Sequence, residues 1–183
     1  MNTFELDQLK FPIGKYKPDK NPSKVQIEDW INVIHQFPIL LKKELSKTNN
    51  KDAINWKYRP NGWTVKQVVH HCADSHMNSI IRFKLALTED KPTIRPYFEE
   101  KWAELSDSQD DNLIDVLSLL SGLHNKWVKL LKSLSASQLQ REYIHPEHGK
   151  TFNLAETIGN YSWHCNHHLA HVKIGLSSLG KYN

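Results

Sequence analysis

Two segments of the sequence are rich in histidine, whose neutral ring is a common ligand of divalent metal ions. The first segment carries four histidines within eight residues, at positions 164, 167, 168 and 171. In a helix, side chains four residues apart lie one turn above each other, so His164/His168 and His167/His171 each form a pair that faces one ion. Helical spacing alone does not choose between these two pairs.

A third nitrogen ligand is available in the second segment, residues 68–76, which contains His70, His71 and His76. Two histidines from one helix and one from another would bind zinc through three nitrogens and leave a coordination position open, as catalytic zinc sites do. An ion held in this way activates a water molecule or ionises a bound thiol. The sequence therefore predicts a catalytic metal centre. The competing interpretation is a set of histidines in the core or on the surface.

Further polar side chains lie beside His71 on the same predicted helix. Asn78 and Arg82 follow His71 along one stripe, and Asp74 flanks that stripe. Asp74 is the candidate for a carboxylate that supports a ligand or acts as general base, and Arg82 is the candidate for binding an anionic substrate group. The competing interpretation for both is a solvated face with surface ion pairs.

Four amphipathic segments would have to position these side chains. Capping signals and apolar residues at three- and four-residue steps predict helices over roughly residues 23–45, 64–88, 111–134 and 153–180. Pro38 predicts a kink or break in the first helix. The segment before the last helix predicts a small hairpin or a plain loop, in which we expect His145 and His148 to face solvent. Four long helices without a convincing long strand predict an all-α protein, a four-helix bundle whose site residues face inward.

The composition is typical of one globular domain, which we expect to span residues 1–183. Residues 1–22 lack helical periodicity and predict an extended N-terminal arm. The net charge of +4 arises from 24 basic and 20 acidic residues without a block of like charge, which argues against nucleic acid as a partner. No segment has the length and apolar character of a membrane span or a signal peptide, so we expect a cytoplasmic protein.

The two cysteines and the last predicted helix bear on redox chemistry and on assembly. Cys72 and Cys165 lie on the apolar stripes of their helices, so we expect them in the core and predict no disulfide framework. The helix over residues 153–180 is apolar on two sides, and the chain has six tryptophans. Both features predict a homodimer.

The segments 61–83 and 163–171, with Phe11-Pro-Ile-Gly14 and Ile94-Arg-Pro-Tyr97, resemble the YfiT-like branch of the DinB-like family over nearly the whole chain. The resemblance implies a four-helix bundle, usually dimeric, that holds one divalent metal ion per subunit with three histidines. Carried over by position, the ligands are His71, His167 and His171. The implied ion is zinc first and nickel second. Cys72 and Asn166 depart from the residues usual in the family, but neither is a matched ligand, so these departures concern the substrate pocket.

Members of that family are described as metal-dependent hydrolases, and some relatives as transferases that attach a low-molecular-weight bacterial thiol to electrophiles. The resemblance therefore implies a hydrolase in which the ion activates water toward a small-molecule substrate. The alternative is a metal-dependent S-transferase that uses a bacillithiol-like thiol. A third interpretation is a non-catalytic metal-binding stress protein, in which His164 or His168 closes the site as a fourth ligand. The sequence has no His-Glu-x-x-His motif, serine-centred elbow or glycine-rich phosphate loop, which argues against peptidase and nucleotide chemistry.

Overall fold

Four long helices make up most of the computed structural model, which describes residues 2–147 and 149–183. They are α2 (Lys24–Leu45), α3 (Val65–Thr88), α5 (Ile114–Lys132) and α7 (Leu154–Ser177). The shorter elements are α1 (Thr3–Lys10), η1 (Lys51–Asn55), α4 (Glu99–Trp102), η2 (Asp107–Gln109), α6 (Ala136–Leu139), β1 (Glu142–His145) and β2 (Lys150–Asn153). The predicted all-α four-helix bundle is confirmed, with one small antiparallel hairpin formed by β1 and β2.

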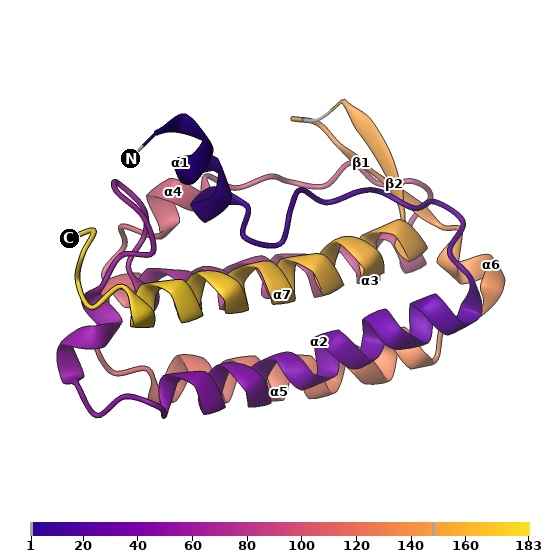
Figure 1. Cartoon of the computed structure of the whole chain (residues 1–183). Coiled ribbons are helices and arrows are strands. Elements are labelled where there is room, and N and C mark those ends of the chain that lie inside the picture. The colour runs from indigo at the N-terminus through magenta and orange to yellow at the C-terminus, as the bar shows by residue number, and fades with distance from the viewer. Residues whose placement is uncertain (1, 148) are drawn as a thin grey trace.

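Each long helix of the bundle packs mainly against two others, in the cyclic order α2, α5, α3, α7. Helices α3 and α7 form one layer and α2 and α5 form the other (Figure 1). Consecutive helices α2 and α3 therefore occupy opposite corners, and so do α5 and α7. The two histidine-rich segments, although far apart in the sequence, lie on the neighbouring helices α3 and α7.

Side-chain caps set the starts of the two helices that carry the histidines. The Thr64 hydroxyl accepts from the backbone N–H of Gln67, whose side chain in turn accepts from the N–H of Thr64. The Asn153 side chain accepts from the N–H of Glu156 at 2.7 Å. These caps satisfy backbone donors that have no partner within the helix, which explains why both helix starts agree with the sequence prediction.

Helix α2 continues as one element through Pro38, so the predicted break does not occur. Proline has no backbone N–H, and the carbonyl oxygen of Ile34, four residues earlier, therefore lacks its usual helical donor. The side chain of His124 on α5 occupies this position, with Nδ1 2.6 Å from the Ile34 oxygen. A side chain from another helix thus replaces the hydrogen bond that the proline removes.

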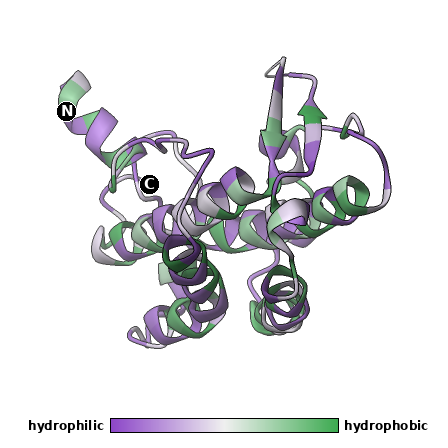
Figure 2. Ribbon diagram, turned by 90° about the vertical axis from the view of Figure 1, so that its right-hand side faces the viewer, coloured by the Kyte–Doolittle hydropathy of each residue, from purple (hydrophilic) through white to green (hydrophobic). Residues whose placement is uncertain are grey.

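The N-terminal arm differs from the prediction over its first part, because residues 3–10 form helix α1, which the capping pair Asn2 and Glu5 begins. Residues 11–22 have no regular secondary structure and cross the outer side of the α3–α7 layer, the side that also carries the hairpin (Figures 1 and 2). Trp163 donates from Nε1 to the Gly14 carbonyl at 3.1 Å, and Tyr16 donates to the Glu156 carbonyl at 2.9 Å.

The arm covers part of the second apolar side of α7, from which a homodimer was expected. Gly159 of α7 leaves space for the rings of Trp30 and Tyr16, because a Cβ atom there would lie 2.9 Å from the Trp30 ring. The homodimer stays a prediction.

None of the helices in the described part of the chain combines the length and hydropathy that a membrane crossing requires.

Candidate metal centre

Histidines from α3 and α7 form two overlapping groups of three among the described residues. One group is His71, His164 and His168, and the other is His167, His168 and His171. Within each group the ligating atoms all lie within 4.8 Å of one another. The set carried over from the family resemblance, His71 with His167 and His171, is not one of these groups. It stays a prediction, and the distances favour a different set.

The first group joins the two helices in the way the sequence predicted for a metal centre. The ring centroids of His164 and His168 are 4.4 Å apart, and those of His71 and His168 are 4.8 Å apart. The third pair, His71 and His164, is separated by 5.4 Å. The Trp63 ring packs against His71 at 4.7 Å and closes one side of the group. One imidazole from α3 and an i, i+4 pair from α7 therefore converge.

The second group comes from α7 alone, and His171 already has partners for both ring nitrogens. Its Nε2 lies 3.2 Å from the carbonyl oxygen of Lys10, which can only accept a hydrogen bond, and its Nδ1 lies 3.3 Å from Nδ1 of His168. The His167 ring stacks on Trp163, with centroids 4.3 Å apart. A nitrogen that donates a proton to a carbonyl has no lone pair for an ion, so the geometry favours the first group.

Burial keeps the first group neutral, which is the form that binds a metal ion. Burial, with a smaller contribution from His167, lowers the pKa of His71 to about 4. Burial also lowers the pKa of His164 and of His168 well below the ordinary value. Three neutral imidazoles from two helices fit zinc, and also nickel, with a position left for water or substrate.

A cavity of about 400 Å³ adjoins this group on the side of His164. It is bounded by α3, α7, β1 and the segment around Tyr97, and its walls include Ser75, Arg82, Asn160 and His164. The Nε atom of Arg82 is buried and has no hydrogen-bond partner among the described residues. Since an unpaired buried donor is costly, a ligand that pairs with Arg82 would gain free energy on binding.

Asp74, the predicted general base, belongs to neither histidine group and is not among the residues that line this cavity. Its carboxyl is half-buried. Burial, together with the charge of Asp107, raises the pKa of Asp74 from 3.8 to about 6. The folded protein therefore binds this proton more tightly than the unfolded chain does, and the ionised carboxylate destabilises the fold above pH 6.

Replacing Asp74 with Asn should therefore raise the free energy of unfolding at pH 7.5 by roughly 1 kcal/mol, discounted for the solvent that reaches this side chain. The gain should shrink as pH falls from about 6 to 3.8, where the wild-type carboxyl becomes protonated. Urea denaturation at pH 7.5 and pH 4.5 measures both values. An equal effect at the two pH values would show that the carboxylate charge is not the cause.

Three histidines outside the predicted ligand set are buried. His76 is fully buried, and its Nε2 lies 3.1 Å from Nδ1 of His164. His124, which the sequence analysis did not single out, is also buried and contacts His76. The sequence held one signal of the burial of His124, which is its position on the apolar stripe of its helix, between Leu120 and Trp127. His145 was expected to face solvent, but it is buried in β1 and lines the cavity. His148 lies outside the described residues.

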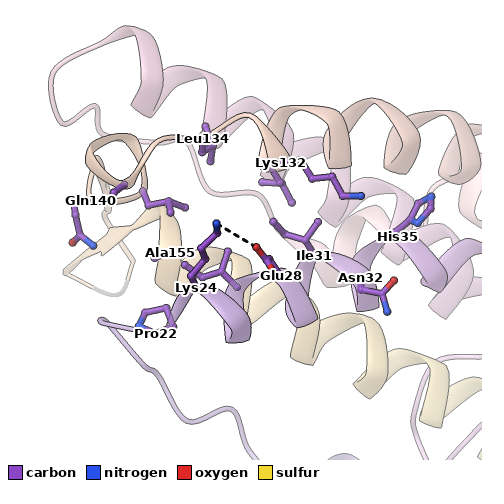
Figure 3. A pocket seen from close by; sticks show the side chains of 14 residues that line it. Pro22, Lys24, Glu28, Ile31, Asn32, His35, Lys132, Leu134, Gln140 and Ala155 are labelled. Atoms are coloured by element: carbon purple, nitrogen blue, oxygen red, sulfur yellow. Dashed lines mark ion pairs between the residues drawn. The ribbon is translucent and has the colours of Figure 1, made fainter.

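A larger cavity, of about 860 Å³, lies between α2, α5 and α6 (Figure 3). Lys24 and Glu28 form an ion pair of 3.9 Å in its wall, and His35 is the histidine that lines it. Neither group of potential metal ligands lies there. Of the two cavities, the smaller one is therefore the one that adjoins candidate metal ligands, through His164.

Comparisons with known proteins agree with this chemistry. The model of the DinB superfamily matches residues 43–172. A Bacillus subtilis protein named "Putative metal-dependent hydrolase YfiT" is 46% identical over 164 residues, which cover 90% of this chain and 92% of the relative. An Oceanobacillus iheyensis protein, "Putative metal-dependent hydrolase OB0782", is 47% identical over 165 residues, covering 89% of this chain and 93% of the relative.

A solved structure of Bacillus subtilis YfiT also matches the fold. It is described as "a probable metal-dependent hydrolase with an unusual four-helix bundle topology". The match has a TM-score of 0.90 at 44% identity and covers 96% of this chain and 99% of the other.

Proposed function

The chain belongs to the DinB superfamily, and from its relatives and its own geometry we propose that it is a metal-dependent hydrolase whose ion is held by His71, His164 and His168. One observation carries this proposal: three imidazoles from two helices, those of His71 and His168 buried and that of His164 half-buried, converge beside a cavity lined by Arg82, whose buried Nε atom has no partner among the described residues. Three nitrogen ligands with an open position are the arrangement of catalytic rather than structural zinc.

A divalent ion at this position would lower the pKa of water in its open position and polarise a substrate oxygen. The chain's own residues supply the rest of the site. The loss of solvation around His71, His164 and His168 lowers their pKa values, so the three rings are neutral and their lone pairs are available at neutral pH. The Trp63 ring excludes solvent from one side of His71.

The cavity also limits the kind of substrate. Arg82 offers a charged donor to a carboxylate or phosphate oxygen of the substrate. Three exposed glutamates, Glu99, Glu100 and Glu147, line the same cavity. The buried Nε atom of Arg82 lacks a hydrogen-bond partner among the described residues, so an anionic group that accepts from it would satisfy this donor despite the neighbouring glutamates. We infer a small substrate with an anionic group next to the scissile bond.

The thiol-transferase alternative uses the same ion with an external thiol in place of water. Neither cysteine of the chain can supply that thiol, because Cys72 and Cys165 are buried and burial raises the pKa of both thiols. A general base must lie within hydrogen-bond reach of the proton it takes, directly or through one water. Asp74 belongs to neither histidine group and does not line the cavity, so its role as general base stays a prediction.

The test is hydrolysis of small chromogenic esters by zinc-loaded and nickel-loaded protein, with and without a low-molecular-weight thiol. We expect ion-dependent turnover without thiol. We also expect an anionic ester to be preferred, and Arg82→Gln should reduce kcat/KM for that ester by roughly 10–100-fold because a charge-assisted hydrogen bond is lost. A neutral ester should be affected much less.

Lys84→Gln is the matched control, because Lys84 is an exposed cation on the same helix and does not line the cavity. It should leave both rates unchanged. Consumption of electrophiles only when thiol is added would replace the hydrolase proposal with the transferase alternative. Retention of the ion without either reaction would favour the non-catalytic interpretation.

A further inference from the structure

A line of hydrogen bonds crosses the bundle and ends at one of the proposed ligands. It starts at the Ile34 carbonyl of α2, which lies 2.6 Å from Nδ1 of His124 on α5. His124 Nε2 lies 2.8 Å from Nδ1 of His76 on α3. His76 Nε2 lies 3.1 Å from Nδ1 of His164 on α7. Each of the four long helices thus contributes one residue.

The carbonyl fixes the direction of every hydrogen bond in this line. Because the Ile34 oxygen can only accept, Nδ1 of His124 carries the proton, and Nε2 of the neutral ring must then accept. His76 consequently donates from Nδ1 and accepts at Nε2. His164 donates from Nδ1 in turn, so the lone pair of His164 lies on Nε2. One backbone oxygen therefore determines the tautomers of three rings.

The rings remain neutral because they are enclosed by the core. His76 has no exposed surface, and the rings of Phe37, Trp127 and Tyr161 surround it at centroid distances of 5.5, 5.7 and 5.6 Å. Burial lowers the pKa of His124 to about 4. The Cys165 sulfur lies 4.0 Å from Nε2 of His76 and adds to the enclosure of this ring.

Pro38 makes the starting carbonyl available. In an uninterrupted helix the N–H of residue 38 would donate to the Ile34 oxygen, but proline has no N–H. Pro38 is also one of the buried residues of α2, so it contributes to the packing of the helix as well. The missing N–H leaves the Ile34 oxygen free to accept from His124 on α5.

A second, shorter line ends at another proposed ligand. The Lys10 carbonyl lies 3.2 Å from Nε2 of His171, so this nitrogen carries the proton. Nδ1 of His171 must then accept, and Nδ1 of His168 donates to it at 3.3 Å. The lone pair of His168 therefore also lies on Nε2. Two independent backbone carbonyls lead to the same tautomer in two neighbouring ligands.

We propose that His76 and His124, anchored on the Ile34 carbonyl that Pro38 leaves free, and His171, anchored on Lys10, are positioning residues that hold His164 and His168 with Nε2 ready to bind the ion. This inference rests on the proposed function in one respect, that His164 and His168 are ligands. Partners that orient ligand histidines typically change metal affinity 10- to 100-fold when they are removed.

Nuclear magnetic resonance of the metal-free protein labelled with ¹⁵N-histidine tests the tautomers without any ion. We expect His76, His124, His164 and His168 to be protonated at Nδ1 at neutral pH, and His171 at Nε2, with single variants used to assign the signals. A proton on Nε2 of His164 or His168 would overturn the inference even if the protein binds metal.

Two variants of His76 separate positioning from packing. His76→Phe fills the space but removes the acceptor, so His164 should lose its fixed tautomer and zinc affinity should fall by roughly 10–100-fold. His76→Gln can accept from His164 and donate to His124, so it should restore the tautomer and most of the affinity. Equal affinity in both variants and the wild type would overturn the inference.

The failure of the proposed function has a different signature. If the expected tautomers are present but the wild-type protein binds no ion, the positioning residues have no ligand to orient, and the metal-centre proposal is wrong. If the ion binds but the tautomers differ, the metal centre stands and the inference is wrong. Isothermal titration with zinc on the same samples distinguishes these results.

Discussion

Alanine at His71, His164 or His168 should abolish stoichiometric metal binding in each of the three single variants. Each change removes one of the three nitrogens that bind the ion. If each nitrogen contributes about a third of the binding free energy of a typical structural zinc site, its loss lowers the affinity by roughly 10²–10⁴-fold. Metal analysis of dialysed protein gives the stoichiometry, and titration with zinc gives the affinity. The helical circular dichroism of the three variants should remain, because the bundle core lies largely outside the site.

His167→Ala is the matched control, because it removes an imidazole from the same turn of α7 that is not in the favoured group. It should retain one ion per chain. This variant also decides between the two sets of ligands, since the set carried over from the family resemblance includes His167. Loss of the ion in His167→Ala, with retention in His164→Ala, would restore that set.

The metal-free protein should lose stability steeply between pH 6.5 and pH 4. Burial lowers the pKa of His71 and of His124 from 6.5 to about 4, so the unfolded chain binds more protons than the folded protein throughout this window. The free energy of unfolding therefore falls as pH falls, by about 1.4 kcal/mol per pH unit for each of these rings. Two such rings together lose about 7 kcal/mol by pH 4, which is comparable to the whole stability of a typical domain.

Urea denaturation at half-unit pH steps measures this slope. His124→Gln provides the control, because glutamine can still donate to the Ile34 carbonyl but does not titrate. Its slope between pH 6 and 4.5 should be smaller than that of the wild type by about 1.4 kcal/mol per pH unit. A wild-type free energy that is constant between pH 7 and 5 would show that these rings are not buried as neutral groups.

The long helices could be predicted from sequence because their signals are local. The capping pair Thr64 and Gln67 sets the start of α3, and Asn153 sets the start of α7. Helix α1 was not predicted, since it has no buried residue and therefore no apolar stripe. The sequence left open whether α2 is kinked or broken at Pro38, because the hydrogen bond that replaces the missing one comes from His124, a residue 86 positions later in the chain.

The site could be predicted only in part. Histidine density predicted that α3 and α7 carry the candidate ligands, and His71 belongs to the group that the distances favour. The spacing of the histidines could not show which pair of α7 binds the ion, because His164/His168 and His167/His171 are both four residues apart. That choice depends on the rotation of α7 about its axis relative to α3, which tertiary packing determines. The relatives named as metal-dependent hydrolases support the chemistry without selecting the pair.

The most direct measurement is anomalous diffraction at the zinc absorption edge from crystals of the zinc-loaded protein. We expect one strong peak per chain, about 2.0–2.1 Å from Nε2 of His71, His164 and His168. His76 Nε2 and His171 Nδ1 should remain directed at the Nδ1 atoms of His164 and His168, outside the coordination sphere. A peak bound by His167 and His171, or the absence of a peak near His71, would contradict this assignment of the metal centre.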